Sequence, residues 1–171
     1  MNNLGKIKEK IEELALKINA PSRLLPGFGR QDFDSQYFIV VDPSEKMCYI
    51  RVERGKEFER RETFNMDELL FWVFDSVTFW MASEFGIEHA RPDEDYRRVR
   101  FKKHEELMGL INLKWQGIIE ERNKISLLVN PFDDNIHLRG ACFRQLRDEG
   151  LPESEITKLA FEKYPVINRY S

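Results

Sequence analysis

Residues 66–89 have the sequence MDELLFWVFDSVTFWMASEFGIEH and contain two of the three tryptophans of the chain. Their apolar side chains return every three or four residues, which stacks them on one face of a helix. These residues are Met66, Leu70, Val73, Val77, Trp80 and Met81. Other large apolar residues fill most of the remaining circumference, so we predict a long apolar central helix over 66–87 that is covered on several sides. Asn65 or Thr63 is the expected N-cap, and Gly86 the expected stop signal.

Three strand-like runs precede this helix, at residues 37–41 (YFIVV), 47–53 (MCYIRVE) and 57–64 (EFERRETF). Short connections of the kind between them join antiparallel neighbours, so we predict a three-stranded antiparallel meander. Alternation of apolar and polar residues predicts one covered face and one solvated face. The preceding segment, residues 22–34, is rich in proline and glycine and is expected to be an ordered loop.

Helical spacing of apolar residues extends over most of the remaining chain. The predicted helices cover residues 4–18, 94–111, 113–129, 136–149 and 152–164. The fold class is therefore α+β, with an N-terminal helix, the meander and then about five helices. A chain of 171 residues with 42% hydrophobic residues is expected to form a single domain, residues 1–171, with a C-terminal helical hairpin (136–165) packed on it.

The overall charge and the cysteine content exclude some classes of protein. The formal net charge is -3, which argues against a dedicated nucleic-acid-binding protein because such proteins usually carry a basic surplus. The two cysteines, Cys48 and Cys142, have no metal-site or disulfide spacing, and we expect both to be reduced and buried. Neither a signal peptide nor a membrane-spanning segment is predicted, so the expected location is the cytoplasm.

Candidate catalytic groups are few. The chain has three histidines, and none lies in a motif that pairs a nucleophile with a base. We therefore predict neither an enzyme nor a bound cofactor. A metal-dependent hydrolase built on Glu84, Glu88, His89 and His104 stays open as an alternative, although His104-Glu105-Glu106 lacks the second histidine of the HExxH motif.

A basic run follows the central helix. It consists of Arg97, Arg98, Arg100, Lys102 and Lys103. A regulatory or nucleic-acid-associated module that uses this run is the second alternative, but acidic residues flank it on both sides. We expect the basic side chains to pair within the protein, with Arg97 and Arg98 as candidate partners of Asp75 and Glu84 on the central helix.

Several stretches together resemble the immunity protein 63 family of bacterial polymorphic toxin systems. The central helix at 66–85, DYRR at 95–98 and FKKHEELM at 101–108 show the similarity most clearly. RVERG at 51–55, ERR at 59–61, the helix that contains Trp115 and NPFDD at 130–134 are also similar. The resemblance covers about residues 37–134 and extends more loosely to 165.

The resemblance implies a bacterial antidote that binds and inhibits one cognate secreted toxin and needs no chemistry of its own. Toxins of these systems that are nucleases tend to have basic surfaces, which would favour an acidic antidote. The candidate toxin-binding residues are Glu68, Trp72, Asp75, Glu84 and Glu88 on the central helix. Nucleic acid and membranes are not expected partners, and the sequence leaves open whether the protein is a monomer or a homodimer.

Overall fold

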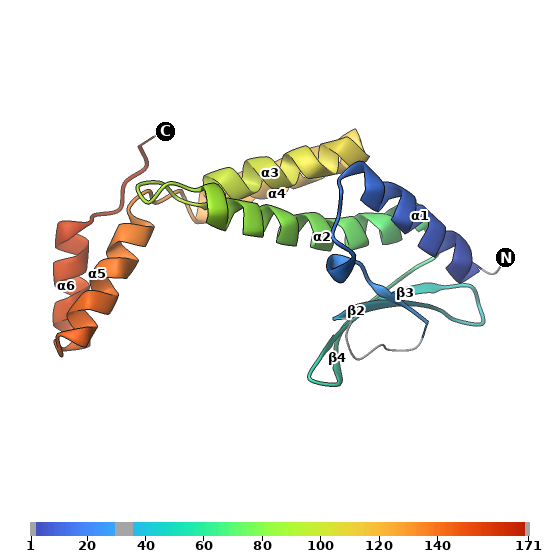
Figure 1. Ribbon diagram of the computed structural model, residues 1–171, viewed down its shortest axis with the longest axis horizontal. Coiled ribbons are helices and arrows are strands. Elements are labelled where there is room, and N and C mark those ends of the chain that lie inside the picture. Colours follow the sequence, from blue (N-terminus) through green and yellow to red (C-terminus); the bar gives the residue numbers. More distant parts are fainter. Residues whose placement is uncertain (1–2, 30–35, 170–171) are drawn as a thin grey trace. The chain divides into compact units, whose positions relative to one another are not determined.

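The computed structural model describes residues 3–29 and 36–169 and confirms the α+β class (Figure 1). In chain order the elements are α1 (Asn3–Lys17), the short 3-10 helix η1 (Ser22–Leu24), β1 (Gly27–Phe28), β2 (Tyr37–Val41), β3 (Met47–Glu53), β4 (Lys56–Thr63), α2 (Met66–His89), α3 (Arg97–Ile111), α4 (Leu113–Val129), α5 (Ile136–Asp148) and α6 (Glu153–Lys163). The predicted N-terminal helix, the meander and the helices that follow it are all present.

The sheet has the order β1-β2-β3-β4, so the prediction of three strands was one strand short. Strands β2, β3 and β4 form the expected antiparallel meander. The additional strand β1 pairs in parallel with β2, with Gly27 opposite Phe38 and Phe28 opposite Ile39. A strand of two residues has no alternation that a sequence pattern could reveal, and it lies within the segment predicted as a loop. Residues 30–34 of that segment lie outside the described residues.

Strand β3 is buried on both faces, which corrects the prediction of one solvated face. Cys48 and Ile50 belong to a small apolar cluster with Phe38 and Val52, and each of these side chains is at most 8% exposed. Tyr49 points to the other face and is 5% exposed. Its ring stacks on Tyr37 with centroids 5.1 Å apart, and burial raises the pKa of its hydroxyl. An aromatic side chain that alternates with apolar residues is therefore a poor marker of a solvated face.

Helix α2 begins at a side-chain cap. The carboxamide oxygen of Asn65 accepts the backbone N–H groups of Asp67 at 2.9 Å and Glu68 at 3.4 Å. The Thr63 hydroxyl accepts the N–H of Asn65 at 2.9 Å and donates to the Glu68 carboxylate at 2.6 Å. Both predicted capping residues thus act at this terminus, with Asn65 as the N-cap of the helix.

The helix continues to His89 rather than stopping at residue 87. Gly86, the expected stop signal, lies inside the helix and is buried. A Cβ atom at this position would lie 3.3 Å from Cβ of Arg100 on α3. The absence of a side chain here therefore serves close packing against α3, a tertiary requirement that the local sequence pattern does not reveal.

Replacing Asn65 by alanine is expected to lower the free energy of unfolding by about 1 kcal/mol, because the first turn of α2 would lose its side-chain acceptor. Asn65→Ser, which keeps an oxygen at the N-cap, is expected to retain most of that stability. Urea denaturation followed by circular dichroism measures both. Equal losses in the two variants would contradict a capping role.

The described residues divide into two compact units. One contains the residues up to Met81 together with Glu106–Gln116, and the other contains Ala82–Glu105 together with the residues from Gly117 onward. Helices α2, α3 and α4 each contribute to both. The single domain over residues 1–171 stays a prediction.

The core of the first unit is built from α1, the sheet and the first part of α2. Fully buried side chains come from each of these elements: Ile7, Ile11, Ile39, Leu69, Val73 and Phe74. Trp115, at the start of α4, is 3% exposed and lies edge-on to Phe71, with ring centroids 5.9 Å apart. The apolar period that predicts α2 therefore identifies the residues that close this core.

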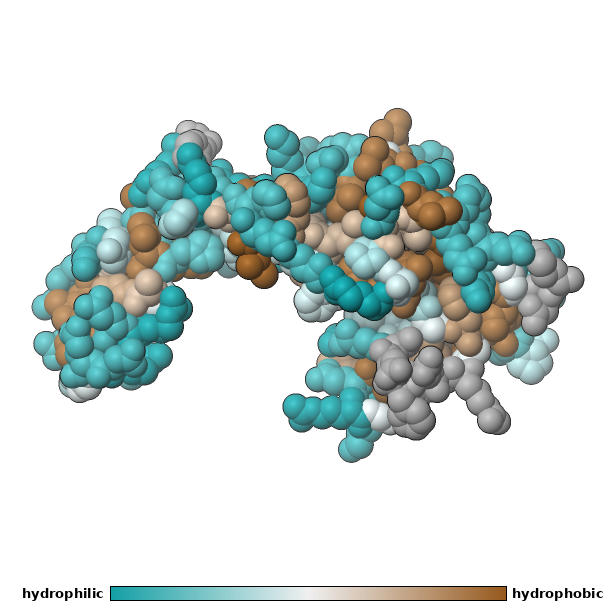
Figure 2. All heavy atoms as spheres, in the orientation of Figure 1, coloured by the Kyte–Doolittle hydropathy of each residue, from teal (hydrophilic) through white to brown (hydrophobic). Residues whose placement is uncertain are grey.

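In the second unit α5 and α6 form the predicted helical hairpin (Figure 1). Ile156 and Ala160 are fully buried, and Phe143 meets Phe161 edge-on with ring centroids 6.3 Å apart. In Figure 2 hydrophilic residues cover most of the visible face of this hairpin. Its packing on the rest of the chain stays a prediction. Among the described helices, none combines the length and the hydropathy needed to cross a bilayer.

Candidate functional site

The five candidate toxin-binding residues all lie on α2 but divide between the two units. Glu68, Trp72 and Asp75 belong to the first unit, at spacings of four and three residues that place them on one side of the helix. Glu84 and Glu88 belong to the second unit. Glu68 and Glu88 are exposed, and the other three side chains are half-buried. The structure therefore places three of the five on one continuous surface.

Strand β4 adds to this surface. The guanidinium of Arg61 lies 5.9 Å from the centre of the Trp72 ring, within range of a cation–π contact, and it also pairs with Glu59 at 2.6 Å. Phe64, in the turn before α2, is 67% exposed. We call Arg61, Phe64, Glu68, Trp72 and Asp75 the α2–β4 surface. Arg61 and Phe64 were not predicted as site residues, because strand alternation does not show which β4 side chains adjoin a later helix.

The α2–β4 surface is suited to binding. It offers one exposed phenylalanine, a half-buried tryptophan and two carboxylates, the mixture of aromatic anchors and charged groups that is typical of protein interfaces. The Glu68 carboxylate is held by the Thr63 hydroxyl, so its position is fixed at the start of the helix. Such a surface can bind a protein without performing chemistry.

The residues of the alternative metal site do not form a metal-binding group. Within residues 3–29 and 36–169, no three His, Cys, Asp or Glu side chains are arranged to hold a metal ion. His89 stacks on Phe85 with ring centroids 3.9 Å apart, and its Nδ1 lies 2.9 Å from the Phe85 carbonyl oxygen. His104 is 2% exposed.

The basic run on α3 is engaged within the second unit. Arg97 pairs with Asp95 at 2.6 Å and Arg98 pairs with Asp134 at 2.8 Å, and the side chains of both arginines are less than a fifth exposed. Arg100 lies over the Tyr96 ring and Lys103 over the Phe85 ring. These contacts leave little of the run to present to a nucleic acid, which requires accessible cations.

Arg97 and Arg98 have acidic partners, Asp95 and Asp134, that the sequence did not suggest. Both Asp95 and Asp134 have no exposed surface. Asp134 belongs to the NPFDD turn, 36 residues from Arg98 in the sequence. Its carboxylate also accepts the backbone N–H groups of Asp95 and Arg169. Charge alternation along the chain suggested Asp75 and Glu84 as partners, but it could not show that this turn folds against α3.

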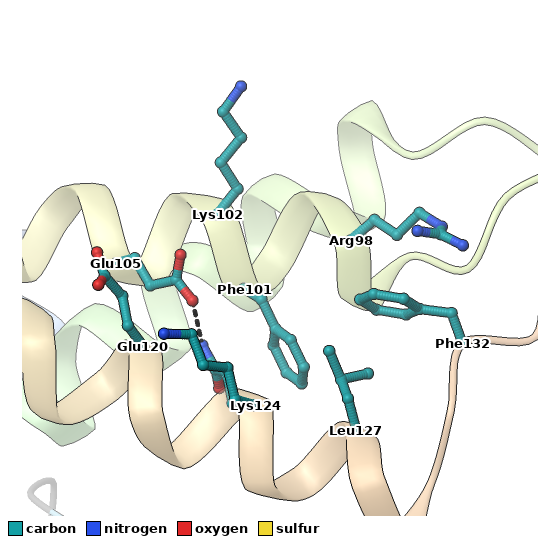
Figure 3. Close-up of a pocket in the computed structure, with 9 residues that line it drawn as sticks. Arg98, Phe101, Lys102, Glu105, Glu120, Lys124, Leu127 and Phe132 are labelled. Carbon is teal, nitrogen blue, oxygen red and sulfur yellow. Dashed lines mark hydrogen bonds between the residues drawn. The ribbon is translucent and has the colours of Figure 1, made fainter. Parts of the chain in front are cut away.

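A shallow cavity of about 320 Å³ lies between α3 and α4 in the second unit (Figure 3). Phe101, Leu127 and Phe132 line its apolar side, and Arg98 lies 4.1 Å over the Phe132 ring. Glu105 accepts a hydrogen bond from the Asn123 side chain at 2.8 Å, while Lys102 points away (Figure 3). The remaining lining residues are Glu120 and Lys124, so the rim carries both signs of charge.

A comparison with known protein families finds a match that includes residues of both units. Residues 43–124 match the family model of immunity protein 63. The resemblance inferred from the sequence is thereby confirmed over this segment. The immunity protein 63 segment includes β3, β4, α2, α3 and the first part of α4, and so the whole α2–β4 surface. No curated protein and no solved structure shows a significant match to the chain.

The matched immunity protein 63 segment ends before the NPFDD turn and the α5–α6 hairpin. The similarity that the sequence suggested for residues 37–42 and 125–134, and the looser similarity up to residue 165, therefore stay predictions. All five candidate toxin-binding residues lie inside the matched segment, since it contains the whole of α2.

Proposed function

We propose that this chain is a toxin-neutralising immunity protein, which binds one cognate secreted toxin in the cytoplasm of the bacterium that makes both. The observation that carries the proposal is the match of residues 43–124 to the immunity protein 63 family. Inhibition is by occupation of a toxin surface, so the protein needs neither a catalytic group nor a cofactor. The free, buried state of Cys48 and Cys142 is in keeping with a reducing compartment.

The α2–β4 surface is the proposed contact area on the first unit. Trp72 and Phe64 supply aromatic area, and tryptophan is among the residues most often found to dominate binding energy. Glu68 and Asp75 supply negative charge, which complements a basic nuclease and would raise the rate of association at low salt. The net charge of -3 also favours association with a basic partner at long range.

Reversing the charge of Glu68 with Glu68→Lys is expected to weaken toxin binding by about tenfold at low salt, chiefly through slower association. Surface plasmon resonance against the catalytically inactivated toxin encoded beside this protein measures the effect at two salt concentrations. The difference from the wild type should shrink at high salt because exposed charges are screened.

The matched control is Glu162→Lys, which changes the net charge by the same amount at an exposed position of α6. Glu162→Lys should leave the association rate close to that of the wild type. If both variants slow association equally, only the net charge matters and the α2–β4 surface is not the contact area.

A further inference from the structure

The segment after α6, residues 164–169, is held to α5 by side chains that reach its backbone. Arg139 on α5 donates to the Tyr164 carbonyl oxygen at 2.7 Å. Asn135, directly before α5, donates from its side-chain amide to the Pro165 carbonyl oxygen at 2.8 Å. Both donors are nearly buried, at 6% and 4% exposed. This irregular segment therefore supplies partners to polar groups of α5 that have little access to water.

Asp134 and Arg98 make further hydrogen bonds with the same segment. The Asp134 N–H donates to the Ile167 carbonyl oxygen at 2.8 Å, and the Asp134 carboxylate accepts the Arg169 N–H at 2.7 Å. Arg98 on α3 donates to the side-chain oxygen of Asn168. Residues 164–169 thus connect the first turn of α3 and the NPFDD turn with the end of α6. We call residues 164–169 the latch.

Asn135 is engaged by the latch although it stands at the N-cap position of α5. An asparagine at this position usually accepts a backbone N–H of the first helical turn, but the Asn135 side chain makes no such bond. Its nitrogen donates to Pro165, and its oxygen accepts Nη2 of Arg169 at 3.0 Å. Both polar atoms of this side chain therefore have their hydrogen-bond partners in the latch.

Burial of apolar side chains contributes little to holding the latch. Val166 is 63% exposed, and Ile167 is half-buried. Among the described residues, most of the large side chains that are fully buried belong to the first unit, whereas Ile119 and Ile156 belong to the second. Segments with few buried apolar contacts open at a lower free-energy cost than the whole protein does.

We propose that the latch and the α5–α6 hairpin open together, as one cooperative unit, while the first unit stays folded. If the latch opened alone, Asn135 and Arg139 would lose these partners while they remained buried, which is costly for polar groups. If the hairpin opens as well, water replaces the lost partners. The latch is therefore a conformational device that fixes the hairpin when closed and releases it when open, with the α2–β4 surface intact in both states.

Hydrogen exchange of the full chain, followed residue by residue with NMR, tests the proposal. The protection factor of a backbone amide reports the free energy of the opening that exposes it. In the wild type, the amides of Asp134, Arg169, α5 and α6 should share similar protection factors. Those of Val73 and Phe74 in the first unit should be higher by about tenfold or more, because they exchange only when that unit unfolds.

Asn135→Ala removes both hydrogen bonds of this side chain with the latch and leaves the pair of Asp134 and Arg98 in place. The protection factors of the latch, α5 and α6 should fall together by about tenfold, and those of α2 should stay unchanged. Asn130→Ala is the matched control, because it removes the same side chain from an exposed position of the NPFDD turn. It should leave all of these protection factors within about threefold of the wild type.

Three results would overturn the proposal. Equal protection of α2, α5 and α6 in the wild type would show that the chain opens only as a whole. A fall in Asn135→Ala that is confined to residues 164–169 would show that the latch opens without the hairpin. Unchanged protection of the latch in Asn135→Ala would show that the hydrogen bonds of Asn135 do not hold it closed.

Discussion

Asp134→Ala is expected to lower the free energy of unfolding by about 3–5 kcal/mol, because it leaves a largely buried arginine without its carboxylate. Asp134 has no exposed surface. Its two oxygens accept Nε and Nη2 of Arg98 at 2.8 and 3.0 Å. They also accept the backbone N–H of Asp95 at 3.0 Å and that of Arg169 at 2.7 Å. Alanine removes all four acceptor contacts at once.

Asp133, beside Asp134, joins the same turn to α5. Its carboxylate pairs with Arg139, which is 6% exposed and also donates to the Tyr164 carbonyl oxygen at 2.7 Å. The NPFDD turn thereby connects α3 with the segment that follows α6. Removing Asp134 is expected to loosen this connection as well as to remove the carboxylate that pairs with Arg98.

Urea denaturation followed by circular dichroism is the appropriate measurement, because all three tryptophans lie in the first unit and Asp134 lies in the second. The matched control is Asp93→Ala. Asp93 is 48% exposed and pairs with Arg169 at 3.3 Å, and surface pairs of this kind contribute at most about 1 kcal/mol. Equal losses in the two variants would show that the buried carboxylate has no special role.

The ion pair between Asp134 and Arg98 should also affect how stability depends on pH. Hydrogen bonds from Arg98, and then those from the backbone of Arg169 and Asp95, hold the pKa of Asp134 well below its ordinary value of 3.8. A depressed folded-state pKa stabilises the protein above the unfolded-state pKa, and this contribution disappears as the pH falls through the folded-state value. The wild type should therefore lose stability below about pH 4 more steeply than Asp134→Ala does.

Phe74→Ala is expected to cost about 3–5 kcal/mol of stability in the first unit, the range for removing a fully buried phenylalanine. Phe74 is 0% exposed, and its ring stacks on Trp115 with centroids 6.4 Å apart. The cavity would open at the centre of the core that α2 closes. Tryptophan fluorescence during urea denaturation reports the unfolding of this unit, which contains all three tryptophans, Trp115 among them.

Phe64→Ala is the control for Phe74→Ala, because the same side chain is removed from a position that is 67% exposed. Its expected effect is within about 0.5 kcal/mol, as for most surface substitutions. A loss in Phe64→Ala that matches the loss in Phe74→Ala would mean that burial does not decide the cost. It would also contradict the assignment of Phe64 to an exposed binding surface.

The elements set by local patterns could be predicted from the sequence, and those set by tertiary contacts could not. The apolar period of α2 and the cap at Asn65 are local, and both are confirmed. Strand β1 depends on pairing with β2, and the position of Gly86 inside α2 depends on α3. The acidic partner of Arg98, Asp134, likewise belongs to a turn that is distant in the sequence.

The candidate site shows the same division. Glu68, Trp72 and Asp75 share one side of α2 as the helical period requires. Arg61 comes from β4, and only the folded chain shows that it lies over the Trp72 ring. Whether an aromatic side chain in an apolar helix is buried like Phe74 or half-exposed like Trp72 depends on what covers it.

The proposed function is tested most directly by isothermal titration calorimetry of the full chain with the catalytically inactivated toxin encoded beside it. Binding of one toxin per chain with a dissociation constant of about 1–100 nM is the predicted result. Trp72→Ala, checked for folding by circular dichroism, should weaken this binding by about thirtyfold or more, as expected for a central aromatic anchor. Absence of binding between the two folded proteins at about 100 µM would contradict the proposed function.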